Sequence, residues 1–217
     1  SLSHPISVLN TADYGVDPQC ILGLKDYFSD LEWDSYLSRQ KKIEHLICHV
    51  PHVLDHSQAV LKNYYSGQAG DSSLEPFLSE LCHSKRMEFN QITSHRKRSV
   101  ASFKIFPDPK GNVVLERFET GDFEQKEASL ADPSNHWKMI SRRFQEADPA
   151  VFSEALKTLI KGISSDLLGL HPHATSINFV THFTQIVSKT GDLRASNAPE
   201  GVHQDGMDYI VSALVVD

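Results

Sequence analysis

Two side chains near the end of the sequence have the types and the spacing to hold a metal ion. His203 and Asp205 are separated by one residue, and glycines flank them at Gly201 and Gly206. On an extended strand both side chains point to the same face, about 6–7 Å apart along the chain. An imidazole and a carboxylate placed in this way supply two ligands of a 2-His-1-carboxylate site, which typically binds Fe(II). The alternative is a turn at Asp205, because a protein with 12 histidines contains a His-x-Asp pattern by chance.

Four further histidines form a second pattern: His45, His49, His52 and His56. Their spacing would place them on one face of a helix, where two histidines at i and i+4 can bind zinc. Pro51 falls inside the run and is expected to interrupt that face. The sequence therefore favours exposed or helix-terminal histidines, with a zinc site as the alternative.

The spacing of apolar side chains predicts the elements that must position these residues. By this criterion the first third of the chain is helical. The expected helices cover residues 21–30, 35–50, 52–65 and 74–82. Two strands, 99–106 and 113–118, then flank a run of Pro, Asp, Gly and Asn that is typical of a turn. These two strands are predicted to form a hairpin.

A long amphipathic helix and further strands follow the hairpin. Asp148 is expected to cap the helix, Pro149 to lie in its first turn and Gly169 to end it. Its apolar stripe consists of Phe152, Leu156, Leu159, Ile160, Ile163 and Leu167. Residues 177–187 and 209–216 are predicted to be strands. Helices followed by several non-local strands predict an α+β fold, with a helical layer against a sheet or barrel.

The composition is that of an ordinary globular protein and excludes several classes. The protein has 217 residues, of which 40% are hydrophobic and 23% charged, so disorder throughout and coiled coils are excluded. No apolar run approaches the roughly 20 residues of a membrane span. The net charge of −7 argues against nucleic-acid binding, which relies on cations. The only dense basic run, 95–98, is interpreted as a solvated turn or the start of a strand, with a localisation signal or an anion site as the alternative.

The cysteine pattern indicates the compartment. Cys20, Cys48 and Cys82 are far apart and odd in number, which predicts a reducing, cytoplasmic location in which the thiols are structural. The length predicts a single domain over 1–217, with a mainly helical part at 1–95. The sequence leaves the oligomeric state open, a homodimer included.

The segment Pro199-Glu200-Gly201-Val202-His203-Gln204-Asp205-Gly206 resembles the signature of one enzyme family. That family is the 2-oxoglutarate/Fe(II) dioxygenases of the bacterial L-isoleucine 4-hydroxylase type, whose core reads Pro-Glu-Gly-x-His-x-Asp-Gly. Upstream, the run Arg96-Lys97-Arg98-Ser99 is similar to the family's Arg-rich strand start. Arg142-Arg143-Phe144 is similar to its Arg-x-Phe element before the long helix. The resemblance covers roughly residues 95–217.

The resemblance implies a double-stranded β-helix, or jelly roll, whose first part is residues 96–217. It implies Fe(II) held by His203 and Asp205, with 2-oxoglutarate as co-substrate and O2 as oxidant. Such enzymes couple the decarboxylation of 2-oxoglutarate to succinate with attack on an unactivated C–H bond. Family substrates are small free aliphatic amino acids, which are hydroxylated. Similar fungal proteins act on valine or isoleucine in secondary metabolism and close an aziridine ring.

The sequence departs from the family pattern at its end. The family has a distal His as third iron ligand, followed by an Arg that pairs with the far carboxylate of 2-oxoglutarate. The sequence stops at Asp217, twelve residues after Asp205. We therefore expect the natural protein to continue with the last strands, the missing ligand and the Arg. Among the residues present, His182 on the preceding strand is a weak alternative for the third ligand.

A free amino acid needs a cation for its carboxylate and acceptors for its ammonium group. Arg98 and Arg142 are the candidates for the carboxylate, because guanidinium binds it in a bidentate manner. Glu200 is the candidate for the ammonium group, and Gln185 for lining the cavity. Structural salt bridges, surface positions or a sheet edge are the alternatives for these residues.

These observations together predict an Fe(II)/2-oxoglutarate-dependent oxygenase that oxidises a small free amino acid. Two rival interpretations belong to other classes. One is a catalytically inactive jelly-roll module that binds a small molecule. The other is a zinc protein or metal-dependent hydrolase that uses the run from His45 to His56.

Overall fold

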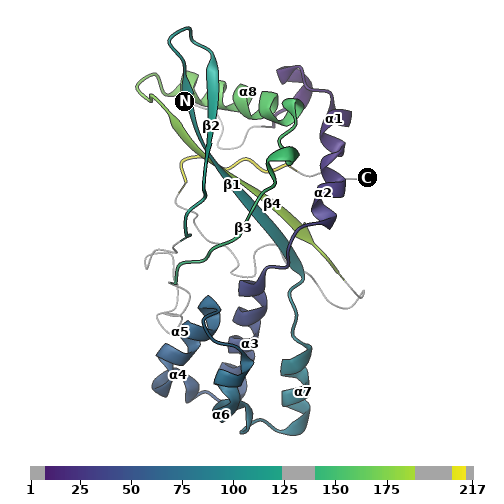
Figure 1. Cartoon of the computed structure of the whole chain (residues 1–217), viewed down its shortest axis with the longest axis vertical. Coiled ribbons are helices and arrows are strands. Elements are labelled where there is room, and N and C mark those ends of the chain that lie inside the picture. Colours follow the sequence, from purple (N-terminus) through teal and green to yellow (C-terminus); the bar gives the residue numbers. More distant parts are fainter. Residues whose placement is uncertain (1–7, 124–139, 189–206, 214–217) are drawn as a thin grey trace.

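The protein folds into a sheet with helices on one side and a separate group of helices at one end (Figure 1). This is a computed structural model, which describes residues 8–123, 140–188 and 207–213; the side chains of Asp55 and His56 are not described. Within these ranges no helix is both long and apolar enough to cross a membrane.

The lower group in Figure 1 consists of short helices that follow one another along the sequence. Its helices are α3 (Ser35–His49), α4 (Val53–His56), α5 (Gln58–Ser66), α6 (Glu75–Leu78) and α7 (His83–Gln91). A 3-10 turn, Asp71–Leu74, joins α5 to α6. The side chain of Asp34 caps α3 by accepting a hydrogen bond from the Leu37 backbone N–H at 3.2 Å.

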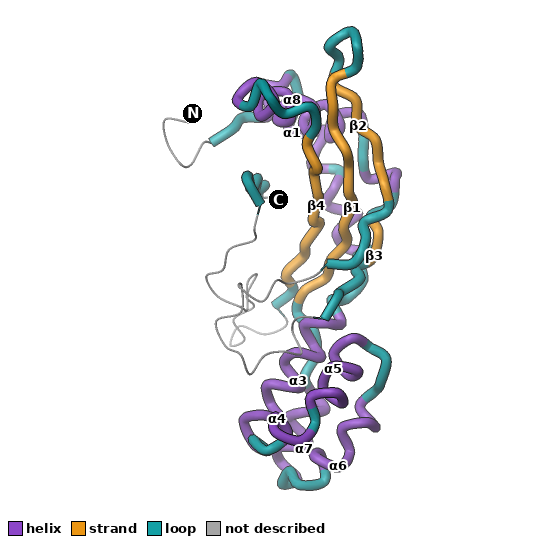
Figure 2. Tube along the Cα trace, turned by 90° about the vertical axis from the view of Figure 1, so that its left-hand side faces the viewer, coloured by secondary structure: helices purple, strands orange, loops and turns teal. Residues whose placement is uncertain are grey.

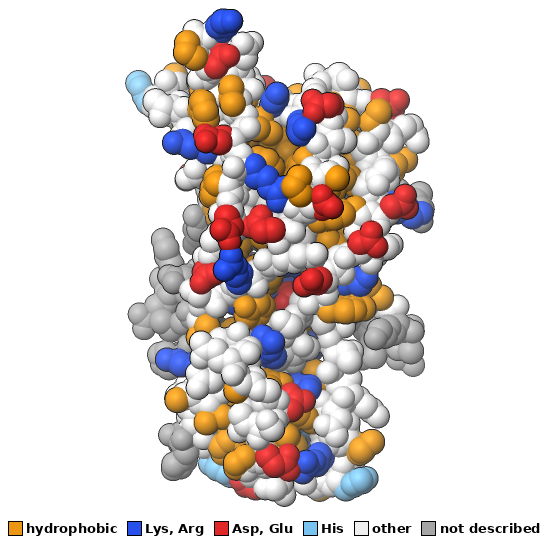
Figure 3. All heavy atoms as spheres, viewed as in Figure 1, with side chains coloured by type: hydrophobic (Ala, Val, Ile, Leu, Met, Phe, Trp, Pro, Cys, Tyr) orange, Lys and Arg blue, Asp and Glu red, His pale blue; other side chains and the backbone are white. Residues whose placement is uncertain are grey.

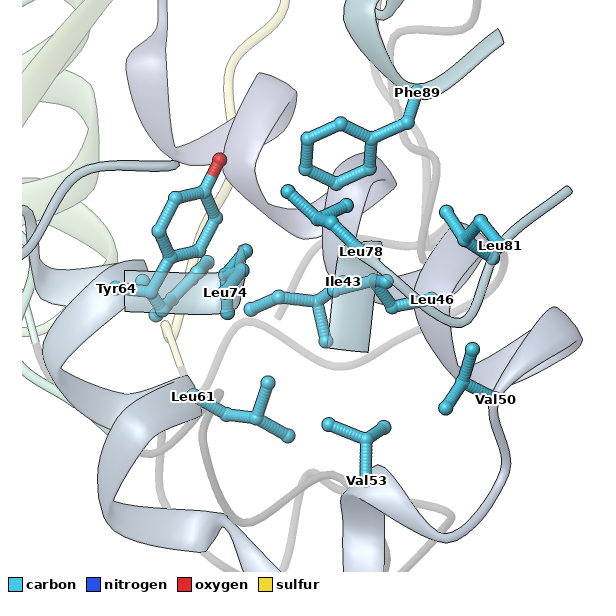
Figure 4. Close-up of a cluster of buried hydrophobic side chains, with 11 residues drawn as sticks. Ile43, Leu46, Val50, Val53, Leu61, Tyr64, Leu74, Leu78, Leu81 and Phe89 are labelled. Carbon is cyan, nitrogen blue, oxygen red and sulfur yellow. The ribbon is translucent and has the colours of Figure 1, made fainter. Parts of the chain in front are cut away.

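These helices enclose a core of their own (Figure 4). Its buried members are Ile43, Leu46, Val50, Val53, Leu61, Tyr64, Tyr65, Leu74, Leu78, Leu81 and Phe89. The members come from all five helices and the loops between them. Helices of this length are at best marginally stable in isolation. Burial of the shared core holds the group together.

The upper part contains the sheet and the remaining helices. Its strands are β1 (Arg96–Pro107), β2 (Val113–Phe118), β3 (Gln145–Glu146) and β4 (Ile177–Ile186). Its helices are α1 (Pro18–Leu22), α2 (Leu24–Ser29) and α8 (Glu154–Leu170), with 3-10 turns at Thr11–Tyr14 and Pro149–Val151. Figure 2 shows the four strands side by side as one curved sheet.

Strand β1 is the centre of the sheet. It pairs antiparallel with β4 along one edge, from Arg96↔Ile186 to Ile105↔Ile177. Along its other edge it pairs antiparallel with β2 and, nearer its start, parallel with β3. Side chains directly opposite one another share a face. This register gives the sheet two faces of different character.

One face, which we call the helix face, carries Ala101, Phe103 and Ile105 of β1 with Phe179 and Phe183 of β4. These side chains form a core with α2, α8 and the 3-10 turn before α8, through residues that include Leu24, Val151, Phe152, Leu156 and Ile160. The Phe103 and Phe152 rings lie 4.9 Å apart, edge to face. The Tyr27 hydroxyl and the Ser99 hydroxyl are 2.9 Å apart, which fixes α2 on this face.

The other face, which we call the site face, carries Arg98, Val100 and Ser102 of β1 opposite Thr184, His182 and Val180 of β4. It is more polar than the helix face. Arg98 is half-buried and His182 is exposed. The two faces alternate along the same strands, so their separation follows from the pleat alone.

A buried ion pair joins the lower helices to the sheet. Arg96, the first residue of β1, donates from Nε and Nη2 to Asp34 Oδ2 at 3.0 and 2.8 Å. The Asp34 side chain is fully buried and the Arg96 side chain is 7% exposed. Because Asp34 also caps α3, one carboxylate fixes both the start of the helix and the start of the strand. β1 begins at Arg96, so the interpretation of 95–98 as the start of a strand is confirmed, while the burial of Arg96 contradicts a fully solvated run.

Several sequence predictions are confirmed. The helix expected at 35–50 is α3, and the expected hairpin is β1–β2 with its turn at Asp108–Asn112. The strand expected at 177–187 is β4. As predicted, α3 ends at His49, just before Pro51. The helices expected at 21–30 and 52–65 are each divided, at Gly23 and at Ser57.

Other predictions were wrong. Asp148 caps the 3-10 turn of Pro149, while Ser153 caps α8 by accepting from the Leu156 N–H. Gly169 does not end α8, which runs one residue further to Leu170. His171 caps the helix, because a residue before a proline, here Pro172, disfavours the helical conformation.

Three further differences concern residues that the apolar pattern misread. The helix α7 was not expected, since Phe89 is its only buried residue. The final strand was expected at 209–216, and its described part, residues 209–213, contains no strand. The three thiols are free and exposed, so they are not structural.

Candidate functional site

The predicted metal ligands fall outside the part of the sequence that the structure describes. His203, Asp205 and Glu200 all lie in residues 189–206. The structure therefore tests the other predicted site residues, which are Arg98, Arg142, Gln185 and His182.

Arg98 and Arg142 come together around one aromatic ring. Arg98 lies on β1, and Phe144 directly precedes β3, whose Gln145 pairs with Ser99. This register brings the Phe144 ring beside Arg98, with the Arg98 guanidinium carbon 4.6 Å from the ring centroid. The guanidinium carbon of Arg142 lies 5.9 Å from the same centroid. Two cations that are 44 positions apart in the sequence thus share a single ring.

Arg142 is held in place by its backbone. Its N–H donates to the Phe123 carbonyl at 2.8 Å, and its carbonyl accepts from the Phe123 N–H at 2.9 Å. The Phe123 ring lies 5.7 Å from the Phe144 ring and 5.3 Å from the His182 ring, both measured between centroids. Phe123 therefore links Arg142 and Phe144 to β4. The cluster Arg98, Phe123, Arg142, Phe144 and His182, which we call the arginine cluster, lies on the site face.

The arginine cluster can bind an anion beside an apolar group. Arg142 Nε is buried and has no hydrogen-bond partner among the described residues. A buried donor without a partner is costly, and a bound carboxylate would satisfy it. Guanidinium also matches a carboxylate in geometry, and the rings of Phe123 and Phe144 provide an apolar surface next to it. These properties suit a small molecule that carries both a carboxylate and an aliphatic group.

Tyr36 ties the arginine cluster to the lower helices. Its ring centroid lies 5.6 Å from that of Phe144, and its hydroxyl accepts a hydrogen bond from the Arg143 backbone N–H at 3.0 Å. On its other side the Tyr36 ring packs against Tyr65 of the lower core, also at 5.6 Å. The position of Phe144 thus depends on α3 as well as on the sheet.

Gln185 lies apart from the arginine cluster. It lies opposite Lys97, and Phe183, two residues earlier on β4, lies opposite Ser99. Gln185 and Phe183 therefore point to the same face of β4, the helix face. That face points away from Arg98, so Gln185 cannot line a cavity on the site face without a change of register.

A groove of about 770 Å³ lies near β2 and β3, and it is distinct from the arginine cluster. Figure 3 shows acidic and basic side chains gathered across this middle part of the molecule. Several of its charged groups pair with neighbouring side chains, although Arg117 Nη1 is buried and has no hydrogen-bond partner among the described residues. Glu146 accepts from Arg117 at 3.3 Å and from the Thr120 backbone N–H at 2.7 Å. Arg117 also donates to the Ala147 carbonyl, and Arg143 pairs with Glu119.

Sequence reasoning missed the aromatic members of the cluster. The sequence points to Phe144 only as part of the run Arg142-Arg143-Phe144, and it gives no functional prediction for Phe123. The spacing of Arg142 and Phe144 by two residues was the available signal, since alternate residues of an extended segment share a face. No sequence signal connects Phe123 to Arg142, because the pair arises from an isolated bridge between two loops.

Comparison with known proteins adds information on the family. A family model described as 2OG-Fe dioxygenase matches residues 77–217, which is more than half of the protein. The match begins before β1 and includes α7, which lies upstream of the sequence resemblance. Searches of the curated proteins and of the solved structures found no match.

Proposed function

The protein belongs to the 2OG-Fe dioxygenase family, and from this premise we propose that it oxidises an aliphatic C–H bond of a small free amino acid of the Ile, Val or Leu type. It is an Fe(II)/2-oxoglutarate-dependent dioxygenase, and it uses Fe(II), 2-oxoglutarate and O2. The bound iron supplies the oxidation of the C–H bond. The protein supplies the binding and orientation of the substrate.

We propose His203 and Asp205 as iron ligands. The support is the donor set, since one imidazole and one carboxylate spaced by a single residue suit Fe(II). The fold proposed for this site is the jelly roll. The curved sheet around β1 would then be one wall of it, with the site face turned toward the iron.

The observation that carries the amino-acid proposal is the arginine cluster. Two guanidinium groups within 6 Å of the Phe144 ring centroid, one of them with a buried donor that has no described partner, suit a carboxylate. The Phe123 and Phe144 rings suit the aliphatic part of the same molecule. Glu200 is proposed to accept hydrogen bonds from the ammonium group. A substrate held at both charged ends presents its aliphatic C–H bonds in a fixed orientation.

The reaction type depends on where the substrate amine lies during oxidation. In hydroxylation one atom of O2 enters the product and the other enters succinate, with loss of CO2. In oxidative ring closure the substrate loses two hydrogens, which leave as water, and a C–N bond forms. Both reactions consume one 2-oxoglutarate and one O2, so succinate release detects either.

The test is succinate release by the full-length protein with Fe(II), ascorbate, 2-oxoglutarate and a pool of the twenty amino acids. Succinate that rises with an aliphatic amino acid, together with a product heavier by one oxygen or lighter by two hydrogens, would support the proposal. Succinate that rises only with substrates that are not amino acids would overturn the substrate class and leave the enzyme family intact.

The iron ligands are tested separately. Replacing His203 or Asp205 by Ala should abolish succinate release while the circular dichroism spectrum stays unchanged. The matched control is His173→Ala, an exposed histidine in the loop after α8, which should keep full activity. Undiminished turnover in either ligand variant would contradict the assignment.

A further inference from the structure

A second group of metal-binding side chains lies on the lower helices. His45 and His49 on α3 and Glu88 on α7 each offer one ligand atom, and these atoms all lie within 4.8 Å of one another. The two imidazole rings are 4.7 Å apart between centroids. Figure 3 shows histidine side chains at the surface of this end of the molecule.

The packing of α7 on α3 brings the three residues together. His45 and His49 are four residues apart and so lie on one face of α3. Phe89, next to Glu88, is fully buried against Ile43 and Leu46 in the lower core (Figure 4). This contact fixes the distance between the carboxylate and the two rings. The spacing therefore rests on a packed core and not on the exposed side chains alone.

The hydrogen bond of His45 prepares it as a ligand. Its Nε2 lies 2.9 Å from the Lys85 carbonyl oxygen, which can only accept, so Nε2 carries the proton. In the neutral ring Nδ1 then keeps a lone pair for a metal. Metal-binding histidines usually donate their other N–H to a carbonyl or carboxylate in this way, which fixes both tautomer and orientation.

Glu88 is ready to act as the third ligand. Its two oxygens accept hydrogen bonds from Lys85 Nζ, each at 2.8 Å. An exposed glutamate is ionised at neutral pH, so both oxygens can act as donors to a metal. Glu88 and His49 are exposed, so an ion can reach them from solvent. An exposed ion pair contributes little to stability, so one oxygen can turn from Lys85 to a metal at low cost.

We propose that His45, His49 and Glu88 form a second metal site, which binds Zn²⁺ with water as the fourth ligand. Two imidazoles and one carboxylate are a donor set that zinc accepts in tetrahedral geometry. The site would link α3 to α7 across the surface of the lower core. It comes from a different part of the sequence than His203 and Asp205, and it does not depend on the proposed amino-acid substrate.

The experiment measures Zn²⁺ binding to the full-length protein that carries His203→Ala, so that the predicted iron ligands cannot hold the ion. Equilibrium dialysis with zinc chloride should give one bound ion per protein molecule. Adding His49→Gln or Glu88→Gln should weaken binding at least tenfold. The matched control is His83→Gln, an exposed histidine at the start of α7 outside the group, which should leave the affinity unchanged.

Two results would overturn the proposal. One is the absence of a bound zinc ion in the His203→Ala protein. The other is equal affinity in the His49→Gln, Glu88→Gln and His83→Gln variants. Thermal unfolding of each variant without metal shows whether its fold is kept. Because both ligand side chains are exposed, the unfolding temperature should stay close to that of the parent protein.

Discussion

The helix face and the site face belong to the same two strands, yet they differ in what lies against them. On the helix face, Phe103, Ile105 and Phe183 are buried against α2 and α8. On the site face, Arg98 and His182 meet the rings of Phe144 and Phe123, which come from loops. Regular helices thus cover one face, and segments that are not helical supply the partners on the other.

This difference separates stability from chemistry at the level of single residues. In the register Ser99↔Phe183 and Arg98↔Thr184, successive residues point to opposite faces of the sheet. Ser99 therefore faces the apolar core, and Arg98 faces the site. A slip of one residue would move Arg98 into the apolar core and Phe103 out of it. The apolar packing of the helix face therefore also holds the arginine cluster in place, although the two share no residue.

The largest effect is expected from a cavity on the helix face. Phe103→Ala removes a buried ring that packs against Phe152 and should lower the free energy of unfolding by about 3–5 kcal/mol. The measurement is urea denaturation followed by circular dichroism. His182→Ala, on the site face and exposed, is the matched control and should change stability by less than about 0.5 kcal/mol. Equal losses in the two variants would contradict the division of tasks between the faces.

A loss of about 3 kcal/mol is expected where the sheet meets the lower helices. Arg96→Met leaves the buried Asp34 carboxylate without its cation, and breaking one side of a buried pair is strongly destabilising. The same urea measurement applies. Arg86→Met, which breaks the exposed pair with Glu75, should cost no more than about 1 kcal/mol. If Arg96→Met is no worse than Arg86→Met, the pair does not join the two parts.

The arginine cluster should show the reverse behaviour, with activity lost and stability kept. A charge-assisted hydrogen bond contributes about 1.5–3 kcal/mol, so Arg98→Lys or Arg142→Lys should lower kcat/KM for the amino acid roughly 10- to 100-fold. The change should lie in the KM for the amino acid and not in that for 2-oxoglutarate. Lys104→Gln, an exposed cation on the same face of β1, is the control and should have full activity. A rise in the KM for 2-oxoglutarate would assign the cluster to the co-substrate instead.

The elements with a strong apolar period could be predicted from the sequence. The stripe of α8 buries a regular set of side chains, and periodicity detects such a set. The hairpin of β1 and β2 is marked by the turn residues between its strands, and β4 by its run of β-branched and aromatic residues. The helix α7 and the break at Ser57 could not be predicted, because α7 buries little beyond Phe89. Their structure follows from packing in the lower core, which involves residues distant in sequence.

The site was predictable only in its chemical types. The arginines and histidines could be proposed because the residue type alone determines which groups they can bind. That Arg98 and Arg142 share Phe144 depends on the parallel pairing of a two-residue strand, β3, which is too short to leave a pattern. The burial of Arg96 likewise depends on Asp34, 62 positions away. Long-range pairs of this kind leave no signal in one sequence.

The smallest effect on stability is expected from the contact between Tyr14 and α8, which covers the helix face from outside. The Tyr14 hydroxyl donates to Asp166 Oδ2 at 2.7 Å, and the ring of Tyr14 leaves no room for a Cβ at Gly162 of α8.

The hydrogen bond to Asp166 raises the pKa of Tyr14 to about 12, above the ordinary value near 10. Folding therefore favours the protonated phenol, so the contribution of this bond is complete below pH 10 and is lost as the pH rises to about 12. The contribution is small because Tyr14 lies near the surface. The pKa of Tyr64 is also raised, by burial and by its hydrogen bond to Asp71. Ultraviolet titration of tyrosinate should therefore show a tyrosine that titrates near pH 12, which is missing in Tyr14→Phe and returns toward pKa 10 in Asp166→Asn, while the signal of Tyr64 stays in both variants. An unchanged titration curve in both variants would show that the contact is not kept in solution.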